Sequence, residues 1–332
     1  MKTIISFFIL FISFKANSQV SNFYFIGMDR DLLKDTSTWA SPVFDGVQIA
    51  YSWRQLETAK DEYDFAMIHE DLELLKKHGK KLFIQVQDVS FSMKWTHVPV
   101  YLVEDSIYHG GVSTQYKFEN DDEISYRELG RVARRWDPEV QKRLHKFYRA
   151  LGKEFDGKIE GINTEESAVD FGKGPLHPAG FTFKRYRDCL MENLAVLKKA
   201  FPRSTVLAYI NFMPGGFLPF QDSSYMKTVY QFAWKNNIAV GGPDLLPYKK
   251  DQMANSYGFI RNSSKKVATG VAVQDGTYEY ISPVTKEKIT AEEIYLFGKD
   301  YLGLKYIFWG SEEPFLHTQA IPYLKRCCSS RL

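Results

Sequence analysis

The stretch that decides the fold is residues 53–65, WRQLETAKDEYDF, which directly follow the apolar run GVQIAY at residues 46–51. A short apolar run is typical of a buried strand, and the amphipathic residues 67–78 that come next have the length and period of a helix. The segment therefore joins a strand to a helix, and it predicts one unit of an alternating strand–helix fold.

The same alternation continues along the chain. Gly79 has the place of a helix C-terminal glycine, and Asp137 has that of an N-cap residue before Pro138. The candidate strands are residues 23–28, 46–51, 81–86, 159–163, 206–211, 238–242, 270–274 and 306–309, and the amphipathic stretches between them include residues 67–78, 138–155, 183–200, 224–236 and 291–302.

Eight strand–helix repeats predict a parallel sheet. No dinucleotide fingerprint and no phosphate-binding loop follows any of these strands, which favours a closed barrel over a doubly wound sheet. We expect an α/β protein whose residues 19–332 form a single (β/α)8 TIM barrel, without a second domain. Its longest insertion, residues 88–136, follows the third strand and is expected to help build the active site.

The first 18 residues have the pattern of a secretory signal peptide. Lys2 gives a positive start, residues 4–14 are apolar, and Ala16, Asn17 and Ser18 are small residues before a cleavage point at Gln19. The apolar run is too short to span a membrane. We therefore expect a mature chain that is secreted or periplasmic, with no membrane span.

Composition excludes several classes of function. The formal net charge of +3 over 332 residues is too small to indicate a nucleic-acid-binding protein. Cys189, Cys327 and Cys328 do not form a disulfide framework, and no cysteine or histidine spacing indicates a metal site. The sequence predicts no cofactor and no metal, and it does not indicate an oligomeric state.

Polar residues gather where the predicted strands end, at the carboxyl rim on which barrel enzymes build their active sites. Crowded polar groups are costly unless they bind a polar ligand, and a carbohydrate offers both hydroxyl groups and apolar ring faces. The residues expected to bind sugar hydroxyls are Arg54, Gln87, Asp88, Asn163, Asn211 and Asp244, and the rings that stack on a sugar or else belong to the core are Tyr51, Trp53 and Trp309.

The segment 53–65 resembles the second strand–loop–helix unit of (β/α)8-barrel glycoside hydrolases of the large retaining-glycosidase clan. Three further stretches are similar to that clan: WDPEV at residues 136–140, NTEE at 163–166 and FWGSEEP at 308–314. The stretch GGPDLLP at residues 241–247 resembles a distinct bacterial branch of these enzymes.

This resemblance implies hydrolysis of O-glycosidic bonds in an oligo- or polysaccharide by two carboxyl groups. The clan has its acid/base glutamate at the end of strand four, close after an asparagine, which implies Glu166, with Glu165 close behind. It has its nucleophile, also a glutamate, at the end of strand seven, where this chain has Asp275. Glu313 after strand eight is the other candidate for the second carboxylate.

The main alternative is a secreted barrel that binds carbohydrate without cleaving it. It is favoured by the aspartate that stands where the clan has its strand-seven glutamate. Glu57, within the opening segment, is interpreted as a structural residue that braces the following loop.

Overall fold

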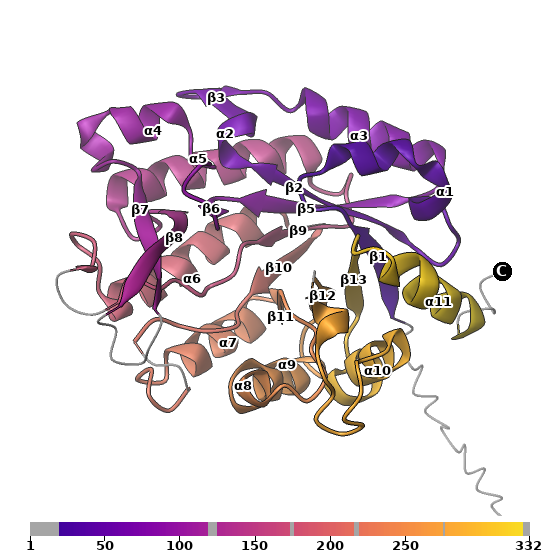
Figure 1. The fold of residues 1–332 in the computed structure, drawn as a ribbon. Helices are drawn as coiled ribbons and strands as arrows, with labels where there is room; N and C mark the ends of the chain where they lie inside the picture. The colour runs from indigo at the N-terminus through magenta and orange to yellow at the C-terminus, as the bar shows by residue number, and fades with distance from the viewer. Residues whose placement is uncertain (1–19, 119–124, 173–175, 216–218, 275, 328–332) are drawn as a thin grey trace, which may run out of the picture.

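The computed structural model describes residues 20–118, 125–172, 176–215, 219–274 and 276–327. The predicted signal peptide and Asp275 lie outside these residues. In the described chain, eight parallel strands close a barrel in the order β1, β2, β5, β9, β10, β11, β12 and β13, and β13 pairs with β1 (Figure 1). The predicted (β/α)8 barrel is therefore confirmed.

The barrel strands coincide with the predicted runs to within a few residues at each end. They are β1 (Ser21–Phe25), β2 (Gly46–Ser52), β5 (Lys81–Gln87), β9 (Gly161–Thr164), β10 (Thr205–Tyr209), β11 (Ala239–Gly242), β12 (Thr269–Val273) and β13 (Tyr306–Gly310).

The predicted helices are present, and several shorter elements were not predicted. The helices are α1 (Thr36–Trp39), α2 (Trp53–Leu56), α3 (Ala66–Lys77), α4 (Val100–Glu104), α5 (Pro138–Phe155), α6 (Phe183–Ala200), α7 (Tyr225–Lys235), α8 (Lys250–Ala254), α9 (Ser256–Ser263), α10 (Ala291–Leu296) and α11 (Ile321–Cys327), with π-helical turns at Phe297–Leu302 and Leu316–Ala320 and short 3-10 turns at Arg30–Lys34, Ser106–Tyr108 and Thr277–Glu279.

The insertion after the third barrel strand contains a small antiparallel sheet. It consists of β6 (Val89–Ser90), β8 (Tyr126–Ala133) and β7 (Val112–Phe118), and β6 lies directly after the carboxyl end of β5 (Figure 1). A second pair, β3 (Glu57–Ala59) and β4 (Glu62–Tyr63), forms a hairpin within the segment 53–65. Among the described residues, no helix is long and apolar enough to cross a membrane.

Along each barrel strand, side chains point alternately into the barrel interior and outward into the core between the strands and the helices. The barrel interior holds Phe23, Phe83, Leu207, Tyr306 and Phe308, whereas their neighbours on the strands pack outward against the helices. A Cβ added at Gly161 would lie 2.5 Å from the ring of Phe83, so β9 needs a glycine beside this ring. The phase of this alternation decides which predicted site residues reach the barrel mouth.

Two predicted helix ends are confirmed. The Asp137 carboxylate accepts hydrogen bonds from the backbone N–H groups of Glu139 and Val140, with Pro138 as the first residue of α5. Gly79 follows α3 with φ +67°, in the left-handed region that favours glycine at a helix C-terminus.

The opening segment is held by the fully buried carboxylate of Glu57. It accepts hydrogen bonds from Trp53 Nε1 at 2.7 Å, Tyr101 OH at 2.8 Å and Arg143 Nη2 at 2.6 Å. This agrees with the interpretation of Glu57 as structural. Tyr101 belongs to α4 and Arg143 to α5, so the carboxylate connects the segment after β2 to both helices.

Replacing Arg143 by methionine should destabilise the protein by about 3–5 kcal/mol, because Glu57 would keep a buried charge without its ion-pair partner. The matched control is Lys146→Met, which removes only a half-exposed contact to Asp61 and should cost less than about 1 kcal/mol. Urea unfolding of the two variants measures the difference. Equal losses in both would show that the Glu57–Arg143 pair is not a principal stabilising contact.

Candidate active site

The barrel interior becomes polar toward the carboxyl ends of its strands. On β5 and β9, Gln85 and Asn163 pair two residues beyond Phe83 and Gly161. Gln48 Nε2 donates a hydrogen bond to Asn163 Oδ1 at 2.8 Å, and both side chains are fully buried. Asn163 was predicted to bind a sugar hydroxyl. That prediction is wrong for this conformation, because its amide is enclosed and already paired.

Glu166 lies at the end of β9 in a half-buried position among polar residues from the next two strands. Asn211, after β10, donates a hydrogen bond from Nδ2 to Glu166 Oε2. Burial raises the pKa of the Glu166 carboxyl to about 7; the Asn211 hydrogen bond opposes this rise and the negative charge of Asp244 adds to it. Near neutral pH Glu166 is therefore present in both protonated and ionised forms.

Asn211 and Asp244, both predicted to bind hydroxyls, lie in this cluster. Asn211 is almost completely buried, so its observed role is to hold Glu166, which corrects the prediction of a direct sugar contact. Asp244 is half-buried after β11, and burial raises the pKa of its carboxyl while Lys249 opposes that rise.

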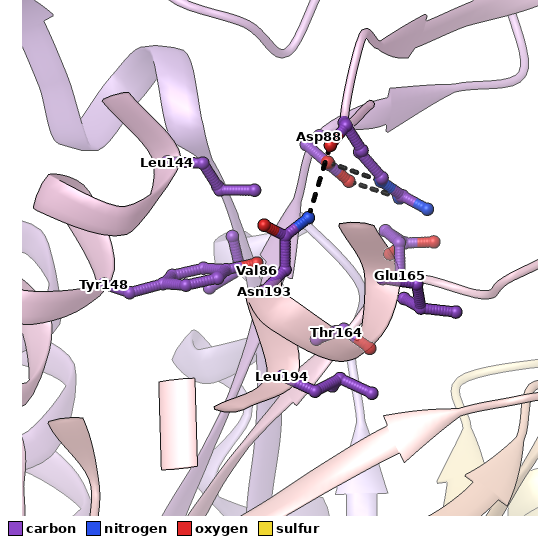
Figure 2. A pocket seen from close by; sticks show the side chains of 10 residues that line it. Val86, Asp88, Leu144, Tyr148, Thr164, Glu165, Asn193 and Leu194 are labelled. Carbon is purple, nitrogen blue, oxygen red and sulfur yellow. Dashed lines mark hydrogen bonds and ion pairs between the residues drawn. The ribbon is translucent and has the colours of Figure 1, made fainter. Parts of the chain in front are cut away.

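Glu165 has a different environment from its neighbour. Burial raises the pKa of its carboxyl to about 8; the charges of Glu166 and Asp88 add to this, and Arg135 opposes it. Its Oε1 has no hydrogen-bond partner among the described residues. Figure 2 shows Glu165 and Asp88 on one side of a cavity and Tyr148 of α5 on the other.

This cavity measures about 20 Å³, room for one water molecule, and lies between the barrel and helices α5 and α6. Glu165 therefore lines this small cavity, whereas Glu166 is hydrogen-bonded to Asn211 after β10 and lies near the charge of Asp244 after β11. This difference favours Glu166 over Glu165 as the residue that meets a ligand.

Arg135 links the third and fourth barrel strands behind the site. Its Nε and Nη2 donate to the two carboxylate oxygens of Asp88 at 2.7 and 2.5 Å, and its Nη1 donates to the backbone oxygen of Glu166 at 3.0 Å. Asp88, predicted to bind a hydroxyl, is instead a buried ion-pair partner, which corrects that prediction. The sequence analysis did not single out Arg135. Two consecutive arginines, Arg134 and Arg135, just before the helix that begins after Asp137 were the available indication of a buried ion pair.

The three rings expected to stack on sugar or join the core belong to the core. Tyr51 OH donates to Asp71 at 2.8 Å, Trp53 Nε1 to Glu57 at 2.7 Å and Trp309 Nε1 to Asn22 at 3.0 Å. None of the three has more than a trace of exposed surface, because all three belong to the core that packs outside the barrel interior. The stacking prediction for these rings is therefore wrong.

Two predicted hydroxyl-binding residues remain accessible at the mouth. Arg54 is exposed on α2, and its backbone N–H donates to the oxygen of His97 at 2.8 Å. Gln87 is the last residue of β5 and is partly exposed. The structure thus leaves both side chains available to a ligand.

The carboxylates after β13 differ from each other. Glu313 is exposed and hydrogen-bonds His317 one turn along the chain. Glu312, which sequence reasoning passed over, accepts a hydrogen bond from the backbone N–H of Gly276 at 3.0 Å and so contacts the loop after β12. The two glutamates are adjacent in the sequence, and nothing in the sequence shows which of them turns toward the loop after β12.

The described residues contain no group of three histidine, cysteine, aspartate or glutamate side chains that could hold a metal ion.

The titration of Glu166 should respond in opposite directions to its two neighbours. Asn211→Ala removes a hydrogen bond to the ionised form and should raise the Glu166 pKa above about 7, whereas Asp244→Asn removes a negative charge and should lower it. NMR of ¹³C-labelled glutamate carboxyls, with Glu166→Gln to assign the signal, measures both shifts. A shift in the same direction for both variants would contradict this description of the site.

No protein-family model matches this sequence, and no curated protein matches it. Solved structures of similar fold are found, however. The catalytic domain of the β-amylase from Paenibacillus polymyxa superimposes with a TM-score of 0.53 at 10% identity, over 88% of this chain and 93% of that one.

Two further structures are similar to a comparable extent. The β-galactosidase from the Antarctic haloarchaeon Halorubrum lacusprofundi gives a TM-score of 0.54 at 12% identity, over 87% of this chain and 52% of that one. Xylanase 10B from Thermotoga petrophila gives 0.51 at 12% identity, over 88% and 82%. A likeness at identities this low shows the fold alone, and that fold is the (β/α)8 barrel seen in this chain.

Proposed function

We propose that this protein is a glycoside hydrolase that cleaves O-glycosidic bonds of an oligo- or polysaccharide with two carboxyl groups. The observation that carries the proposal is Glu166, a partly buried carboxyl at the end of the fourth barrel strand whose pKa is raised to about 7. The barrels that this chain resembles come from a β-amylase, a β-galactosidase and a xylanase, which supports a carbohydrate substrate.

Glu166 acts as the general acid in this mechanism. A carboxyl with a pKa near the working pH keeps a substantial protonated fraction, and it can donate that proton to the leaving glycosidic oxygen. Asn211 fixes the orientation of the carboxyl through its Nδ2 hydrogen bond. Arg135 fixes the backbone of the same residue.

The second carboxylate comes from the seventh or eighth strand. Asp275 follows β12, and Glu312 bonds the backbone of Gly276, the residue next to it. Glu312 is therefore better placed than the exposed Glu313 to assist in or take this role. If Asp275 serves as a base, its shorter side chain favours the wider carboxyl separation of inverting enzymes, roughly 6.5–9.5 Å.

The rim residues Arg54 and Gln87 are assigned to contacts with sugar hydroxyls. The signal-peptide pattern of residues 1–18 supports a secreted or periplasmic location, which amino-terminal sequencing of the exported protein would test by finding Gln19 as its first residue.

A barrel that binds carbohydrate without cleaving it is the second candidate. The aspartate in place of a strand-seven glutamate favours it, because it alters the position at which the related enzymes have a catalytic group. Binding without turnover is its distinguishing property.

Glu166→Gln should lower hydrolysis of aryl glycosides and oligosaccharides by a factor of about 10²–10⁴, because it keeps the shape of the side chain but removes the proton to be donated. A panel of both substrate types, assayed with wild type and variant, measures this loss. Glu73→Gln is the matched control: this glutamate is exposed on α3, and its substitution should leave the rates unchanged.

A fully active Glu166→Gln variant would refute the assignment of the acid. Loss of activity in Glu165→Gln or Glu313→Gln instead would move the acid to that residue. Wild type that binds oligosaccharides but hydrolyses none of them would favour the binding barrel.

A further inference from the structure

We propose that the loop at residues 91–97 is a carbohydrate-binding platform. On this loop Trp95 stacks on a sugar ring outside the catalytic centre, and Phe91 is a second exposed ring of the same loop. The proposal rests on the proposed function, because it names the part of that substrate which lies beyond the cleaved bond. It assigns a role to a loop that contains none of the residues expected to bind the sugar.

Trp95 is unlike the other tryptophans of this chain. Its side chain is 64% exposed, whereas four of the six tryptophans are fully buried. Phe91, four residues earlier, is 56% exposed. Leaving two aromatic rings in water on one short loop forgoes the hydrophobic stabilisation that their burial would give, which a ligand-binding role explains.

The loop is held firmly by hydrogen bonds on both sides of the indole. Ser90 Oγ donates to the backbone oxygen of Ser92 at 2.7 Å, and Arg131 Nη1 of β8 donates to Thr96 Oγ1 at 2.7 Å. A Cβ added at Gly130 would lie 2.8 Å from the Cα of Phe91, so β8 approaches the loop closely. The rings are therefore presented by an ordered backbone, which lowers the entropic cost of binding.

The loop lies at the barrel mouth. It begins three residues after Asp88, whose partner Arg135 donates to the backbone of Glu166. At its far end, the oxygen of His97 accepts the backbone N–H of Arg54, which follows the second barrel strand. In Figure 1 the adjoining β6 lies where β5 ends, so the loop lies on the rim formed by the carboxyl ends of the parallel strands.

The chemistry of the loop favours a sugar over a protein partner. Ser92 and Lys94 stand between the two aromatic residues in the chain, so the loop offers polar groups close to its rings, as a sugar with both hydroxyl groups and apolar faces requires. An indole face matches the apolar C–H face of a pyranose, and the exposed Arg54 on the adjoining α2 offers guanidinium donors to hydroxyl groups. The occupant is thus a ring of an oligosaccharide.

Trp95→Ala tests the platform on two substrates. KM for the hexasaccharide that wild type hydrolyses, chosen from malto-, cello-, xylo- and mannohexaose, should rise about 3- to 10-fold, while kcat/KM for an aryl monoglycoside stays within about twofold of wild type. Trp95→Phe should recover part of the loss. Lys77→Ala, an exposed substitution on α3 away from the loop, is the control and should change neither value.

Calorimetric binding of the same four hexasaccharides to Glu166→Gln, with and without Trp95→Ala, separates this proposal from the proposed function. If wild type hydrolyses nothing but binding weakens about 3- to 10-fold without Trp95, the platform stands and the enzyme assignment fails. The platform is refuted if Trp95→Ala leaves hexasaccharide binding and KM unchanged, or if it lowers kcat/KM equally for the hexasaccharide and the aryl monoglycoside. It is also refuted if no hexasaccharide binds.

Discussion

The candidate site depends on one buried guanidinium, that of Arg135. It is paired with both oxygens of Asp88 and donates to the backbone of Glu166, so it joins the ends of the third and fourth barrel strands to the start of α5. A buried charge is tolerated only when it is paired and hydrogen-bonded. Here its partners are Asp88, after the third barrel strand, and the backbone of Glu166, after the fourth. The hydrogen bond that the buried guanidinium donates thus helps to fix the backbone of the proposed acid, Glu166.

The same region explains how two adjacent glutamates differ. Glu165 lines a small cavity between the barrel and helices α5 and α6 and has its pKa raised to about 8, while Glu166 lies beside Asn211 and Asp244 and has its pKa raised to about 7. Both are raised chiefly by burial. Glu165 is buried beside Asp88 and Arg135, whereas Glu166 lies beside Asn211 and Asp244, which follow the fifth and sixth barrel strands.

The strands and long helices could be predicted because their apolar period is local and depends on neighbouring residues alone. The orientation of the site residues could not. Trp309 and Phe308 are adjacent, yet one faces the helices and the other the barrel interior, and the phase of that alternation follows from barrel closure. Glu312 and Glu313 raised the same difficulty. Exposure of Trp95 depends on how its loop packs on β8, which the sequence does not reveal.

The most direct test of the account is a crystal structure of the Glu166→Gln variant with a bound oligosaccharide. The account predicts a glycosidic oxygen within hydrogen-bond reach, about 2.6–3.2 Å, of the side chain at position 166, with the sugar chain crossing the mouth of the barrel. A sugar bound at the mouth with every glycosidic oxygen far from position 166, or bound on another face of the molecule, would contradict it.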